Sequence, residues 1–176
     1  MNNYVASDLM RYAGKVSSGV FLKTYLKSKS FRWQVAFRLV NGRGIEKLLG
    51  AVLWAFRNRS DFKIGRSTTI GYGLYIGHDG PIVINGTATI GNNVNLSQFT
   101  TIGSNDGKAA QIGDNVYIGP NVCIVEDVTV GNDSTIGAGS VVTKDIPQGA
   151  TAAGNYAKVL NYRNPGRYIM NKWALI

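Results

Sequence analysis

His78 is the only histidine among the 176 residues of the chain, and its imidazole is the side chain best suited to acid–base chemistry near neutral pH. It lies in the stretch IGHDGPIVINGTATIG, residues 76–91. A hydroxyl group is a poor nucleophile at neutral pH, so an imidazole that accepts its proton can activate it for attack on an acyl group. A lone histidine is more often structural or solvated, and its surroundings must decide between these interpretations.

Two other kinds of chemistry find little support in the sequence. Cys123 is the only cysteine, which excludes an intrachain disulfide. No base lies near it in the sequence, so we expect a small packing residue rather than a nucleophile. A carbonic anhydrase site needs three histidines for its zinc, which one histidine per chain cannot supply even in a symmetric trimer. The sequence therefore predicts no metal site.

A six-residue repeat fills the middle of the chain and surrounds His78. Its units begin with Ile, Leu or Val, from Ile64 to Val142, and most of these residues are followed by glycine. This period fits neither an α-helix nor an alternating strand, but it is typical of the short strands and tight turns of a parallel β-helix. Two extra residues follow His78, and four more lengthen the segment SNDGKAAQ at 104–111. We expect the first insertion to bulge beside the imidazole and the second to project as a loop near it.

The formal net charge of +9 lies entirely before the repeat. Residues 1–63 hold 12 Lys and Arg against 3 acidic residues, whereas residues 64–176 hold 7 of each kind. The first part predicts short helices around residues 6–13, 18–28, 31–41 and 44–58. The last helix has an apolar face at helical spacing, formed by Ile45, Leu48, Leu49, Val52, Leu53 and Phe56.

This basic segment has more than one interpretation. We favour packing of the apolar face on the β-helix, with the charges solvated. A basic amphipathic helix can also lie on an anionic membrane or contact an anionic sugar. Without a recognised motif we expect no nucleic-acid binding. No run of 18 apolar residues and no signal-peptide core is present, so we expect a cytoplasmic protein, with peripheral contact to the inner face of the membrane as the alternative.

The repeat resembles the left-handed β-helix hexapeptide acyltransferases. The similarity is carried by GLYIGHDGPIVINGTATIG, NLSQFTTIG, GDNVYIGPNVCI, TIGAGSVVTKDIP and TAAG, and it is strongest to serine acetyltransferases and bacterial polysaccharide O-acetyltransferases. It implies a mainly β fold, with a left-handed parallel β-helix of about four coils over residues 62–160. A basic helical segment at 1–61 precedes it, and a tail at 161–176 follows. The resemblance further implies a homotrimer with sites between adjacent prisms, and acetyl-CoA as the acyl donor.

In such an enzyme His78 is the expected general base. With three units per coil, the third residues of equivalent units form an outward column: His78, Gln98, Pro120 and Ala138. The resemblance places acetyl-CoA beside this column, with these residues as its binding site: Gly119, Pro120, Ala138, Thr143, Lys144 and Lys158. Asp79 and Gln98 are the expected contacts to the acceptor substrate.

Two departures from the family pattern leave parts of the mechanism open. Galactoside acetyltransferases stabilise the oxyanion with the backbone N–H at the position of Pro120, but proline has none. The backbone of residues 103–105 is one alternative donor. Serine acetyltransferases orient the histidine with an aspartate where this chain has Lys63. Asp61, Glu126 or a backbone carbonyl could serve instead.

The expected acceptor is a sugar hydroxyl of a surface polysaccharide or its precursor. Serine acetyltransferases carry an aspartate before the catalytic histidine and a second histidine in the following loop, where this chain has Gly77 and the histidine-free SNDGKAAQ. A site that cannot neutralise a zwitterion should not select free serine, because an unpaired charge is costly to desolvate. Serine O-acetylation is the alternative function, and a noncatalytic trimeric scaffold is the alternative of another class.

Overall fold

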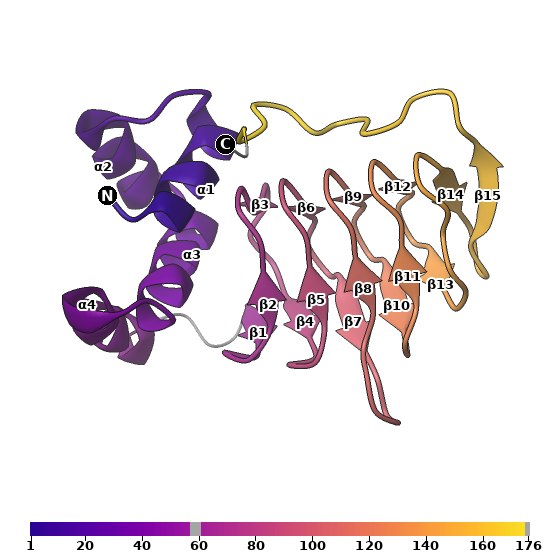
Figure 1. Cartoon of the computed structure of the whole chain (residues 1–176), viewed down its shortest axis with the longest axis horizontal. Helices are drawn as coiled ribbons and strands as arrows, with labels where there is room; N and C mark the ends of the chain where they lie inside the picture. The colour runs from indigo at the N-terminus through magenta and orange to yellow at the C-terminus, as the bar shows by residue number, and fades with distance from the viewer. Residues whose placement is uncertain (57–60, 175–176) are drawn as a thin grey trace.

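A bundle of helices stands at one end of a triangular β-solenoid in the computed structural model, which describes residues 1–56 and 61–174 (Figure 1). The described residues form the helices α1 (Asn3–Ala13), α2 (Ser18–Lys27), α3 (Lys29–Val40) and α4 (Gly44–Ala55). They correspond to the helical segments predicted from the sequence. The last helix was predicted to reach residue 58, but α4 ends at Ala55 with Phe56 as its C-cap, and residues 57–58 lie outside the described residues.

The solenoid has three walls, which the chain visits in turn. Wall 1 contains β1 (Phe62–Ile64), β4 (Ile82–Ile84), β7 (Thr101–Gly103), β10 (Cys123–Val125) and β13 (Val141–Val142). Wall 2 contains β2 (Thr69–Ile70), β5 (Thr89–Ile90), β8 (Gln111–Ile112) and β11 (Thr129–Val130). Wall 3 contains β3 (Tyr75–Ile76), β6 (Asn95–Leu96), β9 (Tyr117–Ile118), β12 (Thr135–Ile136), β14 (Thr151–Ala153) and β15 (Lys158–Asn161). All strands pair in parallel except β15, which is antiparallel to β14.

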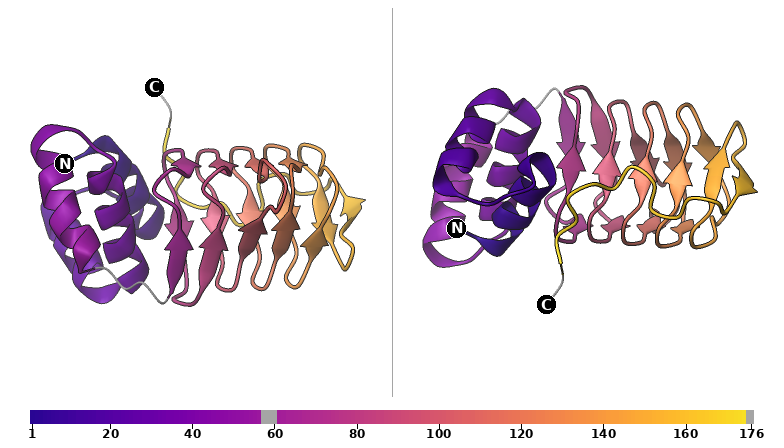
Figure 2. Two further views of the ribbon diagram at one scale, coloured as in Figure 1. Left: turned by 90° about the horizontal axis from the view of Figure 1, so that it is seen from below. Right: turned by 90° about the horizontal axis from the view of Figure 1, so that it is seen from above.

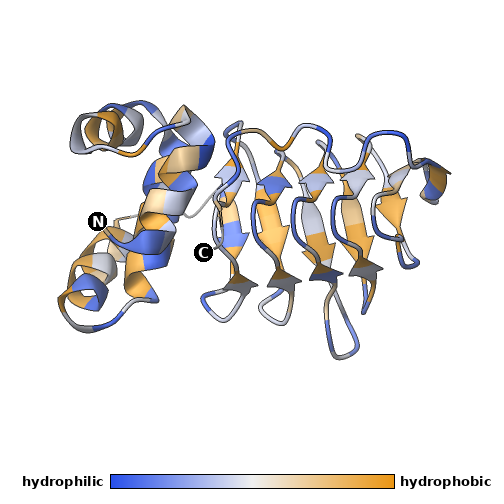
Figure 3. Cartoon of the chain, turned by 45° about the horizontal axis from the view of Figure 1, so that its top comes forward, coloured by the Kyte–Doolittle hydropathy of each residue, from blue (hydrophilic) through white to orange (hydrophobic). Residues whose placement is uncertain are grey.

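The first residues of the repeat units fill the interior, which explains the six-residue period. Ile76 aligns with Leu96, and Leu96 with Ile118, so that each branched side chain stacks on its counterpart one coil away. All three are buried. Figure 3 shows hydrophobic colouring on strands of successive coils. The left-handed β-helix predicted from the sequence is confirmed, but it has about five turns rather than four. The last turn is completed by segments around Ile146 and Ala152, which lack the Ile-Gly pattern and so escaped the count.

Helices α1 and α3 cover the open edge of the first coil. An exposed β-edge leaves backbone groups unpaired, and the end of a solenoid needs a cap. The Gln34 side-chain amide donates to the Leu74 carbonyl at 2.8 Å, and the Tyr12 hydroxyl donates to the Ile76 carbonyl at 2.7 Å. The helices thus hold the strand that leads directly into His78.

A buried ion pair anchors this cap. Arg38 Nε lies 2.9 Å from Asp8 Oδ2, Arg38 also donates to the Ile70 carbonyl at 2.7 Å, and Asp8 accepts the Leu74 N–H at 2.8 Å. Arg38→Ala leaves a buried carboxylate without its cation, so we expect the free energy of unfolding to fall by about 3–5 kcal/mol. Urea denaturation measures this loss. The exposed Arg43→Ala is the control, with an expected change within about 0.5 kcal/mol. Equal losses in the two variants would show that the pair does not anchor the cap.

The apolar face of α4 does not pack on the β-helix, so the interpretation that we favoured from the sequence is wrong. Ile45 is 75% exposed and Phe56 is 87% exposed. The opposite side of α4 packs on α3 through Gly50, where any Cβ would collide with the backbone of Val40. The absence of a side chain at Gly50 therefore decides which side of this helix is buried.

The tail after β15 runs back along the solenoid to the helical bundle (Figures 1 and 2). Trp173 N–H donates to Asn93 Oδ1 at 2.8 Å, and Arg11 Nε donates to the Met170 carbonyl at 2.7 Å. Asn93 stands between β5 and β6, so the tail covers the corner between walls 2 and 3. The described residues of the tail, 162–174, make no hydrogen bond to wall 1.

Candidate active site

His78 stands at the corner where wall 3 turns into wall 1, directly after β3. We call this edge of the prism the His78 corner. Strand register confirms the predicted column, because Ile76 pairs with Leu96, Leu96 with Ile118, and Ile118 with Ile136. The residues two positions later therefore follow one another along the corner: His78, Gln98, Pro120 and Ala138.

The two-residue insertion after His78 forms the predicted bulge. Gly80 has φ 149°, a value that favours glycine, and a Cβ there would lie 2.9 Å from the Cβ of Gln98. Beyond the bulge the coils return to register, with Phe99 N–H donating to the Pro81 carbonyl at 2.6 Å. The His78 side chain is exposed and makes no hydrogen bond within the described residues. The imidazole is thus open to a ligand at the corner.

Asp79 ties the bulge to the helical cap. Its Oδ1 accepts from Ser30 Oγ at 2.7 Å and from Ser30 N–H at 3.2 Å, at the start of α3. Sequence reasoning missed Ser30, which is 49 positions away and has no motif that marks it. The acceptor contact expected for Asp79 stays a prediction, and a substrate would have to share a carboxylate that already has two donors.

Gln98 presents an unpaired polar atom beside the bulge. Its Oε1 is buried and has no hydrogen-bond partner within the described residues. A buried acceptor left without a donor costs about 1–3 kcal/mol, so such an atom invites a donor from a ligand. The contact expected between Gln98 and the acceptor stays a prediction.

The long β7–β8 loop lies at a different edge, where wall 1 turns into wall 2 (Figure 1). We call this edge the loop corner. Glu126 accepts there from Ser104 Oγ at 2.9 Å and from Asn105 N–H at 3.4 Å, and these bonds lower the pKa of its carboxyl. The expectation that the loop stands near His78 is therefore wrong within one chain, because wall 1 separates them. For the same reason Glu126 cannot orient His78 of its own chain. Asp61 stays a candidate, since its carbonyl accepts from Ile82 N–H at 2.7 Å beside the bulge.

The predicted coenzyme residues divide between the same two edges. Gly119, Pro120 and Ala138 lie at the His78 corner, and Lys158 pairs with Ala153 beyond them at the end of wall 3. Val142 pairs with Ile124 on wall 1, so the residues that follow it, Thr143 and Lys144, turn into the loop corner beside Glu126. One chain does not bring all these residues together.

Comparisons with known proteins agree with this architecture. Residues 109–144 match the family described as bacterial transferase hexapeptide (six repeats). Serine acetyltransferase 3, mitochondrial, of Arabidopsis thaliana is 43% identical over 95 residues, which cover 52% of this chain and 24% of that protein. The bifunctional protein GlmU of Streptococcus suis is 42% identical over 92 residues, covering 51% and 19%. The chain thus spans about a quarter or less of the length of these two relatives.

A solved structure extends the match over most of the chain. The serine acetyltransferase of Neisseria gonorrhoeae in complex with serine superposes with a TM-score of 0.71 and 32% identity, covering 88% of this chain and 67% of that one. A serine acetyltransferase in complex with CoA gives a TM-score of 0.68 and 27% identity over 89% of this chain and 67% of that one. Hexapeptide units, a left-handed solenoid and this likeness have one explanation: the chain belongs to the left-handed β-helix hexapeptide acyltransferases.

Proposed function

We propose that this protein is an acetyl-CoA-dependent O-acetyltransferase in which His78 is the general base. The observation that carries the proposal is an exposed imidazole at one edge of a hexapeptide acyltransferase prism, at the head of a column that leads toward Lys158. His78 takes the proton of the acceptor hydroxyl while its oxygen attacks the thioester carbonyl. The tetrahedral oxyanion then collapses, the C–S bond breaks, and the imidazolium returns the proton to the thiolate of CoA.

The column below His78 suits an extended coenzyme. Gly119 packs so closely on the next coil that a Cβ would lie 2.8 Å from the Ala138 nitrogen, and the wall is correspondingly flat. Lys158 is exposed at the end of this path, where an ammonium group can meet phosphates. Pro120 offers no N–H to the oxyanion. The alternative donor, the backbone of residues 103–105, belongs to the loop corner and can reach His78 only from a neighbouring chain.

A homotrimer follows from this division of the site. His78 and Lys158 lie at one edge, whereas Lys144 and the β7–β8 loop lie at another. A second copy that sets its loop corner against the His78 corner would complete the site, and cyclic symmetry would then give three such sites. Wall 1 suits the contact because residues 162–174 of the tail make no hydrogen bond to it and Val83 is exposed there.

Two acceptors have specific support. L-serine is the first candidate, because the superposing Neisseria enzyme is a serine acetyltransferase that was solved in complex with serine. A sugar hydroxyl is the second. Gly77 offers no carboxylate to an ammonium group, and the carboxylate of Asp79 is already bonded to Ser30. The sequence neighbours of His78 thus offer a zwitterion a single carboxylate, and its Oδ1 is held on the helical cap by Ser30.

An assay with a panel of acceptors distinguishes L-serine from a sugar hydroxyl as the acceptor. Release of CoA from acetyl-CoA is followed with L-serine, nucleotide sugars, lipid-linked glycans and oligosaccharides side by side. We expect saturable turnover of serine at millimolar concentration. Acetylated glycans with serine unchanged would move the assignment to a sugar hydroxyl. No turnover with any acceptor, together with no acetyl-CoA binding by calorimetry, would indicate a noncatalytic scaffold.

A further inference from the structure

Helices α2 and α4 form the end of the molecule farthest from β15 (Figures 1 and 2), and both carry exposed apolar side chains. The exposed residues of α4 recur at helical spacing: Ile45, Leu48, Leu49, Val52 and Phe56. Leu22 and Leu26 are exposed on α2. Isolated exposed leucines are ordinary, but a stripe of exposed apolar residues along one helix, as on α4, marks an interaction site.

The outward direction of the α4 face is fixed by its inner side. Gly50 rests on the α3 backbone at Val40 and leaves no room for another residue type. Glu46, on the same helix, accepts a hydrogen bond from Asn2 Nδ2 at 2.8 Å. Turning the apolar stripe inward would break both contacts. The exposure is therefore built into the bundle.

Helices α2 and α4 also carry exposed lysine and arginine side chains. Arg43 and Lys47 are exposed at α4, and Lys23 and Lys27 each follow one of the exposed leucines of α2. The acidic residues of 1–56 are Asp8, which is paired with Arg38, and Glu46, which is bonded to Asn2. A second copy of this face would bring like charges together, whereas an anionic lipid surface would meet opposite charge and an apolar interior at once.

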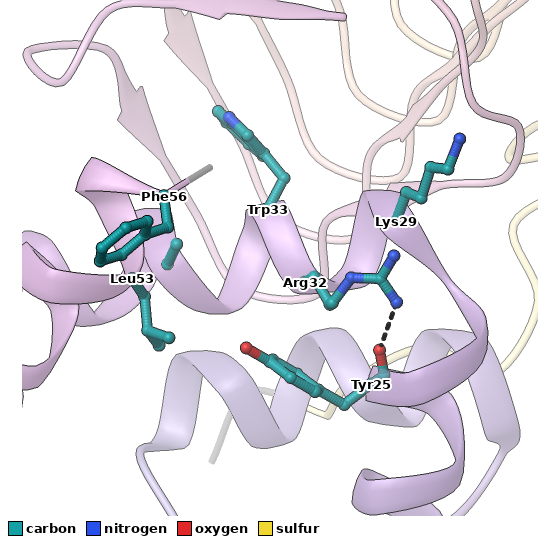
Figure 4. Close-up of a pocket in the computed structure, with 7 residues that line it drawn as sticks. Tyr25, Lys29, Arg32, Trp33, Leu53 and Phe56 are labelled. Carbon is teal, nitrogen blue, oxygen red and sulfur yellow. Dashed lines mark hydrogen bonds between the residues drawn. The ribbon is translucent and has the colours of Figure 1, made fainter. Parts of the chain in front are cut away.

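A pocket between α2, α3 and α4 has the same mixed character. Its volume is about 330 Å³. Figure 4 shows Leu53 and Phe56 on one side of it, with Arg32 and Lys29 on the other. Arg32 Nη1 donates to the Tyr25 carbonyl at 2.9 Å, and Lys29 is exposed. Apolar and cationic side chains thus line the same pocket at this end of the molecule.

We propose that the α2–α4 end binds the surface of membranes that contain anionic lipid. The α4 stripe enters the headgroup region, while the lysines and arginines contact lipid phosphates. None of the helices in 1–56 and 61–174 is long and apolar enough to cross a bilayer, so the contact is interfacial. If the proposed trimer holds, its cyclic symmetry presents three such ends on one side, and their combined binding exceeds that of a single end.

Vesicle co-sedimentation tests the proposal. The full chain is mixed with vesicles of phosphatidylcholine alone or with phosphatidylglycerol added. We expect it to sediment with the anionic vesicles and to be released by high salt. The variant Leu48→Glu Val52→Glu should bind at least about tenfold more weakly. Thr89→Glu Thr129→Glu makes the same charge change on exposed sites of wall 2 and should bind like the wild type.

Circular dichroism and acetyl-CoA binding check that each variant is folded and that its coenzyme site is intact. If α4 does not tolerate the glutamates, Lys23→Glu Lys47→Glu supplies a second test and should also lose binding. The proposal is overturned if the wild type stays in the supernatant with anionic vesicles, or if the α4 variant binds as tightly as its control. A third outcome is that the wild type does not bind vesicles but forms particles larger than a trimer, and that the α4 variant does not form them. This outcome would assign the surface to self-association instead. None of these outcomes depends on turnover. The vesicle experiment therefore tests membrane binding even if no acceptor in the panel is acetylated.

Discussion

His78→Ala is expected to lower kcat at least about a hundredfold while leaving the affinity for acetyl-CoA nearly unchanged. The side chain is exposed at its corner and holds no hydrogen bond within the described residues, so its removal deletes a base without loosening the fold. No second histidine can take over, because the chain has only one. Steady-state kinetics gives kcat, and calorimetry gives the affinity for the coenzyme.

A matched substitution serves as the control for this result. Thr129→Ala shortens an exposed side chain on wall 2 and keeps the Thr129 N–H that donates to Asp145 Oδ1, so kcat and coenzyme affinity should stay as they are. A loss of coenzyme affinity together with kcat would place His78 in binding rather than in proton transfer. Undiminished turnover in His78→Ala would remove it from the mechanism.

The hexapeptide period predicted the column at the His78 corner because stacking requires it. Branched residues at every sixth position can fill a prism only if equivalent units lie one above another, as Ile76, Leu96 and Ile118 do. Counting the same units in threes would also have placed Lys144 at the loop corner, since its unit belongs to wall 1. The same register places the β7–β8 loop between walls 1 and 2, so the sequence already contains the signal that separates this loop from His78 within one chain.

Other features depend on contacts that no local pattern encodes. The hydrogen bonds from Ser30 to Asp79 join residues 49 positions apart. Helical periodicity correctly predicted the stripe on α4, but an apolar stripe looks the same whether it faces its own core or a partner. The decisive residue was Gly50 on the opposite side, whose contact with the α3 backbone becomes visible only in the folded bundle.

Mixed trimers of His78→Ala chains and Lys144→Glu chains are expected to recover activity that neither variant has alone. Each proposed site takes His78 from one chain and Lys144 from the next, because wall 1 separates these residues within a chain. Random mixing in equal amounts then leaves both residues intact in about a quarter of the sites. Co-expression in equal amounts yields this random mixture, which is assayed without separating its species. Its turnover is measured at limiting acetyl-CoA, because loss of the Lys144 ammonium lowers the rate most when the coenzyme is not saturating.

A second mixture distinguishes sites between chains from sites within them. When wild-type chains are mixed with chains that carry both changes, about half of the sites survive if each lies within one chain, but only about a quarter if each lies between two. Light scattering should report about three times the chain mass of 19.0 kDa for every mixture. Activity of the first mixture no greater than the sum of its parents, or a stable and active monomer, would contradict the shared site. Recovery near a quarter in both mixtures is the result that only a site between chains can give.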